Sequence, residues 1–107
     1  MIMKTFFVYM VRCRDEKYYV GITNDVDRRL VEHNLGLNPH CYTYFRRPVS
    51  LVFTTGYRNV AEAIAFEKQL KGWSRAKKES LITGDWARIK ELARGDKRQA
   101  HPSTSSG

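Results

Sequence analysis

The sequence predicts an α+β fold, in which a small, three-stranded, mainly antiparallel sheet is flanked by helices in the order β-β-α-β-α-α. Three observations lead to this class. Short runs rich in aromatic and β-branched residues occur twice near the amino terminus and once near the middle. Between and after these runs, apolar residues recur at helical spacing. Hydrophobic residues make up 42% of the 107-residue chain, which is enough for one core and excludes a disordered protein.

The first two strands are predicted over residues 6–11 and 18–23, where Phe, Tyr, Val, Ile and Thr dominate. A polar stretch, Arg14–Lys17, separates them and predicts the turn of a β-hairpin. A turn centred near the start of this stretch would set Tyr9 roughly opposite Tyr19, where cross-strand neighbours share a face. We therefore expect two phenols to lie together on one side of the sheet.

A first helix is predicted from Asn24, as its capping residue, to about Asn34, because Gly36 follows as a stop. At about 100° per residue, Arg29 and His33 fall beside the apolar stripe of this helix, one turn apart. Both side chains are therefore expected to point toward the sheet.

The middle of the chain is predicted to hold a loop, a strand and a second helix. Arg46 and Arg47 lie in the loop, which has no clean period and contains Gly and Pro. The third strand is expected over residues 49–57, and the second helix over residues 60–71 with Asn59 as its cap.

The carboxyl-terminal part is predicted to be helical and then irregular. A basic third helix is expected from the capping residue Ser74 to Ile82, and a weaker helix over residues 85–93. The remaining residues are mostly Gly, Lys, Arg, Pro and Ser and lack hydrophobic anchors. The predicted organisation is one domain over residues 1–93, followed by a flexible tail over residues 94–107.

One carboxylate is placed where the core is expected. Glu67 lies among the apolar positions of the second helix, which are Val60, Ala63, Ile64 and Leu70. A buried charge needs a partner, a metal or a substrate to offset its desolvation. From the residues alone, both metal coordination and a buried ion pair with Arg29 remain open.

The net charge of +8 favours a polyanionic partner, with nucleic acid ahead of an anionic membrane surface. The apolar run at residues 6–11 is too short to span a bilayer, and residues 1–5 do not resemble a signal peptide. A cytoplasmic location without membrane or obligate protein partner is therefore expected. Cys13 and Cys41 are expected to be reduced thiols without a role. The cations expected to contact a DNA phosphate backbone are Arg46, Arg47, Lys71, Arg75, Lys77 and Lys78.

Taken singly, the tyrosines fit ordinary strand packing and the histidine fits a structural role. Together, the candidate catalytic residues form a set suited to phosphodiester hydrolysis. The carboxylate can hold a divalent cation, the guanidinium can neutralise phosphate charge, and a phenol or imidazole can transfer protons. This set is Tyr9, Tyr19, Arg29, His33 and Glu67.

The two tyrosine triplets, Val8-Tyr9-Met10 and Tyr19-Val20-Gly21, followed by Arg29 and His33, resemble the signature of the GIY-YIG nucleases. The resemblance covers about residues 6–82. The later motifs are similar to the small single-domain bacterial branch of this superfamily, whose function is unassigned. These motifs are Arg46-Arg47-Pro48-Val49, the helix with Ala63, Glu67 and Lys71, and Trp73-Ser74-Arg75.

The resemblance implies that Tyr9 and Tyr19 are the motif tyrosines, Arg29 the motif arginine and Glu67 the single metal ligand, with His33 one turn after Arg29. It implies a DNA endonuclease dependent on Mg²⁺ or Mn²⁺, with repair or recombination as its setting. Which tyrosine acts as the base stays open.

Two other functions are compatible with the sequence. A catalytically inert nucleic-acid-binding module of the same fold would keep the basic surface without turnover. A protein-interaction domain would use the predicted third helix to dock a partner.

Overall fold

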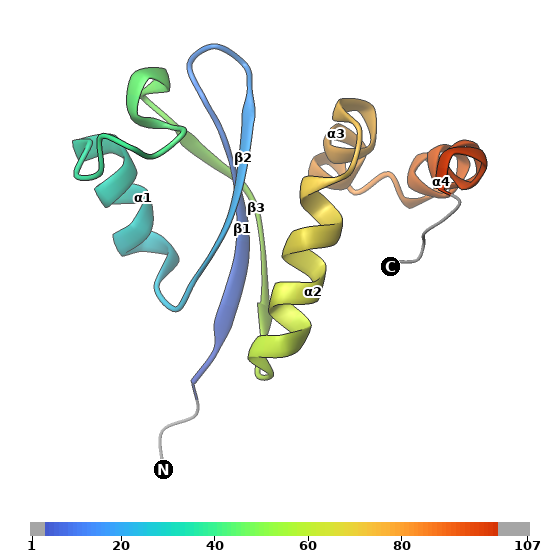
Figure 1. Cartoon of the computed structure of the whole chain (residues 1–107), viewed down its shortest axis with the longest axis horizontal. Coiled ribbons are helices and arrows are strands. Elements are labelled where there is room, and N and C mark those ends of the chain that lie inside the picture. Colours follow the sequence, from blue (N-terminus) through green and yellow to red (C-terminus); the bar gives the residue numbers. More distant parts are fainter. Residues whose placement is uncertain (1–3, 101–107) are drawn as a thin grey trace. The chain divides into compact units, whose positions relative to one another are not determined.

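A three-stranded antiparallel sheet organises the amino-terminal part of the structure, a computed structural model that describes residues 4–100 (Figure 1). The central strand β1 (Phe6–Arg12) pairs on one side with β2 (Tyr18–Thr23) and on the other with β3 (Ser50–Tyr57). Helices follow β2 and β3 along the chain, so the predicted α+β class is confirmed.

The β1–β2 hairpin has a different register from the one predicted. Tyr9 pairs with Gly21, and Val11 pairs with Tyr19, because the turn is centred on Asp15. Moving the centre by one residue moves every cross-strand partner by two, which keeps each side chain on its face. The two tyrosines are therefore diagonal neighbours rather than opposite each other, with ring centroids 6.3 Å apart.

Helix α1 (Val26–Leu35) begins one residue later than predicted. Asp25, and not Asn24, is the cap, since its carboxylate accepts a hydrogen bond from the backbone N–H of Arg28 at 3.0 Å. The Asn24 side chain instead accepts from the Arg28 guanidinium at 3.2 Å. Gly36 ends the helix in the left-handed conformation, at φ 68°, as expected of a glycine stop.

Helices α1 and α2 (Val60–Lys71) cover opposite faces of the sheet (Figure 1). On the α1 face, Leu30 packs against a buried cluster that includes Tyr9 and Val11. On the α2 face, Phe66 contacts the rings of Phe53 and Tyr57, with centroids 6.4 and 6.1 Å away. Asn59 caps α2 through its side-chain oxygen, as predicted.

The chain divides into two compact units, Met1–Lys68 and Gln69–Gly107. The second unit contains α3 (Arg75–Thr83), which Ser74 caps as predicted, and α4 (Trp86–Ala100). Helix α4 continues past the predicted end at residue 93, because most residues that follow are good helix formers even without apolar anchors. Residues 101–107 of the predicted tail lie outside the described residues. Within residues 4–100, no helix is both long and apolar enough to cross a membrane.

Candidate active site

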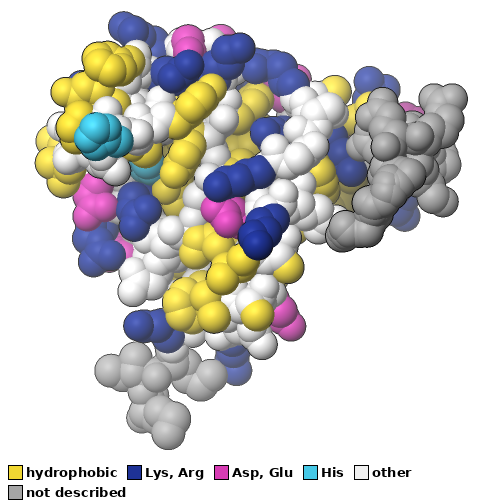
Figure 2. Space-filling model, in the orientation of Figure 1, with side chains coloured by type: hydrophobic (Ala, Val, Ile, Leu, Met, Phe, Trp, Pro, Cys, Tyr) yellow, Lys and Arg dark blue, Asp and Glu magenta, His cyan; other side chains and the backbone are white. Residues whose placement is uncertain are grey.

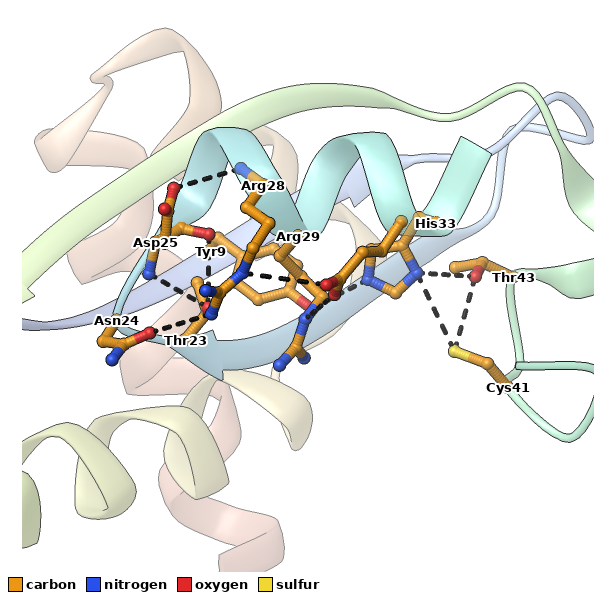
Figure 3. Close-up of polar contacts among 10 residues, drawn as sticks. Tyr9, Thr23, Asn24, Asp25, Arg28, Arg29, His33, Cys41 and Thr43 are labelled. Carbon is orange, nitrogen blue, oxygen red and sulfur yellow. Dashed lines mark hydrogen bonds and ion pairs between the residues drawn. The ribbon is translucent and has the colours of Figure 1, made fainter. Parts of the chain in front are cut away.

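A buried hydrogen bond between Tyr9 and His33 forms the centre of the candidate site (Figure 3). It joins the Tyr9 hydroxyl, on β1, to the His33 Nε2, on α1, at 2.8 Å. Tyr9 is 2% exposed and His33 is 7% exposed. The Tyr19 ring, on β2, lies against the same imidazole in an edge-on arrangement with centroids 5.3 Å apart. The hairpin and α1 thus bring three of the predicted residues together.

Arg29 joins this cluster from one turn earlier on α1. Its guanidinium lowers the pKa of the Tyr9 phenol and forms an ion pair with Glu32, with Nε 3.1 Å from Oε1. The Arg29 side chain is 38% exposed, so one side of the guanidinium remains open to a ligand. This position suits a cation that recognises phosphate.

Burial shifts the pKa of Tyr9, Tyr19 and His33 in the direction that keeps each side chain neutral. It raises the pKa of Tyr9 to about 12, with a further contribution from Tyr19, while the Arg29 charge opposes the shift. Burial also raises the pKa of Tyr19. Burial and the nearby Arg29 charge lower the pKa of His33. At neutral pH both phenols therefore carry their protons and the imidazole is uncharged.

Glu67 is half-buried at the edge of the buried face of α2, not in its middle as predicted. Ala63 and the half-buried Phe66 form that face, because the Phe66 ring makes the contacts with β3. The negative charge of Glu67 contributes to the raised pKa of Tyr19, after burial and Cys41. The carboxylate therefore acts electrostatically on the candidate site. Two positions of the predicted apolar face are exposed, at 44% and 40%: Val60 and Ile64.

A cavity of about 440 Å³ opens beside these side chains. One part of it is lined by Tyr19, Arg29, Glu32 and His33, and residues from the loop over 36–44 line the rest. A concave site with a few convergent polar groups is typical of ligand binding.

Two loop residues in contact with His33 were not predicted as part of the site. Thr43 is 1% exposed, and its hydroxyl oxygen lies 2.8 Å from the His33 Nδ1. The Cys41 sulfur lies 3.4 Å from this hydroxyl, so a residue expected to have no role contacts a partner of the site histidine. Both cysteines are free thiols, as expected. An irregular loop has no period from which such contacts could be inferred.

Arg46, predicted to contact phosphate, makes several contacts within the protein. Its Nε lies 3.0 Å from an Asp15 carboxylate oxygen, and its Nη1 donates to the Tyr42 carbonyl at 3.0 Å. Its guanidinium also lies 4.0 Å from the centroid of the Tyr42 ring, which stacks on Tyr19. Arg46 thereby connects the hairpin turn to the loop beside the cavity.

Arg47 is half-buried against the same loop. Its Nε donates to the Tyr44 carbonyl at 2.7 Å, and its guanidinium lies 4.6 Å from the Tyr44 ring centroid. Part of its hydrogen-bonding capacity is therefore used within the protein.

Lys77, in the second unit, does not fit the exposed phosphate contact predicted for it. It is 8% exposed, and its ammonium lies 4.4 Å from the centroid of the Trp73 ring. A cation over an aromatic face is stabilised there, which explains why this basic residue is buried.

The other predicted cations of the second unit are more accessible. Lys71 is exposed, and Arg75 is exposed while forming an ion pair with Glu79 at 3.0 Å. Lys78 is half-buried, and burial lowers its pKa.

The donor set is compatible with a divalent cation shared with a substrate. Among residues 4–100, no cluster of three or more His, Cys, Asp or Glu side chains could hold a metal by itself. Mg²⁺ is usually held by one or two carboxylates together with waters and substrate phosphate oxygens. One accessible carboxylate, Glu67, fits this mode of binding.

Gly21 leaves the space that Tyr9 needs. A Cβ atom at this position would lie 2.6 Å from the Tyr9 hydroxyl oxygen. We expect Gly21→Ala to displace the ring and to reduce the free energy of unfolding by about 1–3 kcal/mol, measured by urea denaturation. Gly56→Ala is the control and should cost less stability, because its Cβ would meet Phe7 at the longer distance of 3.2 Å. Equal stability of Gly21→Ala and wild type would contradict this assignment.

Comparison with known proteins identifies the family. Residues 5–80 match the family model described as the GIY-YIG catalytic domain. A UPF0213 protein of Staphylococcus saprophyticus is 37% identical over 81 residues, covering 76% of this chain and 98% of that protein. A UPF0213 protein of Halobacterium salinarum is 45% identical over 75 residues, covering 70% of this chain and 96% of that protein.

A solved structure has a similar fold. The solution NMR structure of protein EF2693 from E. faecalis is 32% identical and has a TM-score of 0.55, covering 78% of this chain and 88% of that one. The match to the catalytic-domain model spans most of the chain, including all four side chains that meet beside the cavity. The chain belongs to the GIY-YIG family, a nuclease family, and is similar to its small UPF0213 members.

Proposed function

We propose that this protein is a divalent-metal-dependent endonuclease that hydrolyses phosphodiester bonds in DNA. The observation that carries the proposal is the buried Tyr9–His33 hydrogen bond with the Arg29 guanidinium beside it, at a cavity open to solvent. This arrangement combines a route for a proton with a fixed positive charge, and both are needed to hydrolyse a phosphodiester.

The hydrogen bond from Tyr9 to His33 provides a route for the proton of the attacking water. Water attacking phosphorus must lose a proton, but a phenol with a pKa of about 12 is rarely ionised at neutral pH. Tyr9 can receive the water proton as it passes its own proton to the neutral His33 Nε2, 2.8 Å away. The proton leaves the nucleophile without a stable phenolate, and the imidazole becomes charged.

The charge that develops on the phosphate has two sources of stabilisation. Arg29 offers a preorganised guanidinium with a partly exposed face. Glu67, together with phosphate oxygens and water, would hold Mg²⁺ or Mn²⁺, which would supply charge neutralisation at the leaving oxygen.

The basic surface supports a nucleic-acid substrate. The formal net charge is +8, and Figure 2 shows Lys and Arg side chains on several elements of the visible face, with fewer acidic ones. Such a surface binds DNA through its phosphates, independently of sequence. The proposed contacts, beyond the arginines of the loop, are Lys71, Arg75 and Lys78.

We expect DNA binding to weaken steeply with salt, because each neutralised phosphate releases condensed counterions. The slope of log K against log salt should be about −0.9 for each phosphate contacted. The double variant Lys71→Ala with Lys78→Ala should reduce this slope by about 0.9 for each cation removed, measured by fluorescence anisotropy. Lys77→Ala is the control, since Lys77 is buried and should leave the slope unchanged. An equal reduction in both variants would contradict these contacts.

An inert nucleic-acid-binding module with the same fold is the second candidate, favoured by the basic surface alone. Incubation of the protein with single-stranded, duplex and branched DNA, each with Mg²⁺, Mn²⁺ or a chelator, distinguishes the two. A nuclease cuts at least one DNA only when a metal is present. Binding to all three without any cleavage would support the inert module and contradict the proposal. A role in DNA repair or recombination would follow from a preference for the branched substrate.

A further inference from the structure

A directional chain of hydrogen bonds runs through His33 to the loop beside the cavity (Figure 3). The Tyr9 hydroxyl is 2.8 Å from the His33 Nε2, and the His33 Nδ1 is 2.8 Å from the Thr43 hydroxyl oxygen. The Thr43 hydroxyl is in turn 3.4 Å from the Cys41 sulfur. Each imidazole nitrogen has one close oxygen partner, so the position of the ring proton decides the direction of every bond in the chain.

The Tyr9 end of the chain is compatible with one particular direction. The Tyr9 hydroxyl has one proton to donate, and the His33 Nε2 lies 2.8 Å from its oxygen. A nitrogen that accepts a hydrogen bond carries no proton. In this direction a neutral His33 has its proton on Nδ1.

The Thr43 end of the chain selects this direction. A threonine hydroxyl has one proton, and the Thr43 hydroxyl donates it to the Cys41 sulfur. Its oxygen is then free to accept the N–H of the His33 Nδ1. At 1% exposure, Thr43 is shielded from water that could replace either bond. The Cys41 sulfur itself is 3.8 Å from Nδ1, a longer and weaker contact than the Thr43 oxygen.

We propose that Thr43 is a positioning residue that holds His33 in its Nδ1-protonated tautomer, so that Nε2 faces Tyr9 as a proton acceptor. Thr43 does not touch the substrate in this role and acts through the histidine. The effect of Thr43 on cleavage rests on the proposed nuclease function. The tautomer of His33 can be observed whether or not the protein cleaves DNA. Free histidine side chains favour the Nε2-protonated tautomer, which makes the expected state diagnostic.

The tautomer can be measured directly on the full chain. In two-bond ¹⁵N–¹H NMR spectra at neutral pH, we expect His33 of the wild type to carry its proton on Nδ1, with His33→Gln used to assign the signals. Thr43→Val keeps the shape of the side chain but removes the acceptor, so the Nε2-protonated form should increase. Thr43→Ser restores a hydroxyl and should restore the wild-type tautomer.

Either of two results would overturn the proposal: a wild-type His33 protonated on Nε2, or Thr43→Val spectra with Nδ1 still protonated. The wild-type spectrum decides the first point even if Thr43→Val does not fold.

Cleavage assays test the consequence separately. Under single turnover, Thr43→Val should slow cleavage about 10- to 100-fold, the range for partners that orient a functional histidine, with DNA affinity unchanged. Thr43→Ser should cleave at close to the wild-type rate. The groups around the imidazole that shape its pH profile are Tyr9, Tyr19, Arg29, Glu32 and Cys41.

Failure of the proposed nuclease function can be distinguished from failure of the positioning role of Thr43. A wild type that has the Nδ1 tautomer but cuts no DNA under any condition would contradict the nuclease function and leave the positioning intact. A wild type that cuts DNA with Nε2 protonated would contradict the positioning alone.

Discussion

Replacing Glu67 with Gln is expected to abolish Mg²⁺-dependent DNA cleavage while the protein remains folded and bound to DNA. Gln preserves the size and much of the hydrogen bonding of Glu but removes the charge that a hard cation needs. Since Glu67 is half-buried at the edge of α2, the variant should lose little stability. Cleavage assays with Mg²⁺ and Mn²⁺ measure the effect, and Mn²⁺ should rescue little of the activity.

A matched control separates the charge of Glu67 from a general effect on α2. Glu62→Gln alters an exposed carboxylate in the first turn of the same helix and should cleave like wild type. If Glu67 were instead a buried ion-pair partner, Glu67→Gln would reduce the free energy of unfolding by about 3 kcal/mol without any link to metal. Thermal melts with and without Mg²⁺ distinguish these outcomes. Wild-type cleavage by Glu67→Gln would remove the carboxylate from the mechanism.

Arg29→Ala is expected to slow the chemical step by on the order of 10²-fold or more, the scale for losing a preorganised charge contact to a transition state. Arg29 both lines the cavity and lowers the pKa of the Tyr9 phenol through its charge, so its loss affects the phosphate charge and the first proton donor together. Single-turnover cleavage at saturating enzyme measures the step, since weaker binding is then overcome.

Two further variants make the Arg29 prediction specific. Arg28→Ala removes the neighbouring cation, which is 57% exposed and also pairs with Glu32, and should leave the chemical step unchanged. Arg29→Lys keeps the charge but loses the planar fork and should recover only part of the rate. A normal rate in Arg29→Ala with reduced affinity alone would show that Arg29 binds DNA without taking part in catalysis.

Much of the fold follows from local patterns in the sequence. Residue type and period predict β3, α2 and α3 to within a residue at each end, because each element has an apolar face and a recognisable cap or stop. The hairpin register was wrong because it depends on turn conformation. Glu16 adopts φ 70° in this turn, a left-handed conformation that no hydrophobic pattern indicates.

The candidate site also contains contacts that the sequence predicts and contacts that it does not. The meeting of Tyr9, Tyr19 and His33 could be predicted because a hairpin and the following helix place them by short-range geometry. Thr43 could not be predicted, since its contact with His33 depends on the path of an irregular loop. Glu67 lies at the edge of the buried face because Phe66 packs on β3 and extends that face on the side of Ala63 away from Glu67.

The proposed nuclease function requires this cluster of side chains to hydrolyse DNA with a divalent metal. The most direct test is single-turnover cleavage of one end-labelled DNA by the wild type with Mg²⁺, then with a chelator, beside Arg29→Ala purified in the same way. We expect cuts within the DNA that appear only for the wild type and only with Mg²⁺. DNA that is bound by the wild type but stays intact, or equal cleavage by Arg29→Ala, would contradict it.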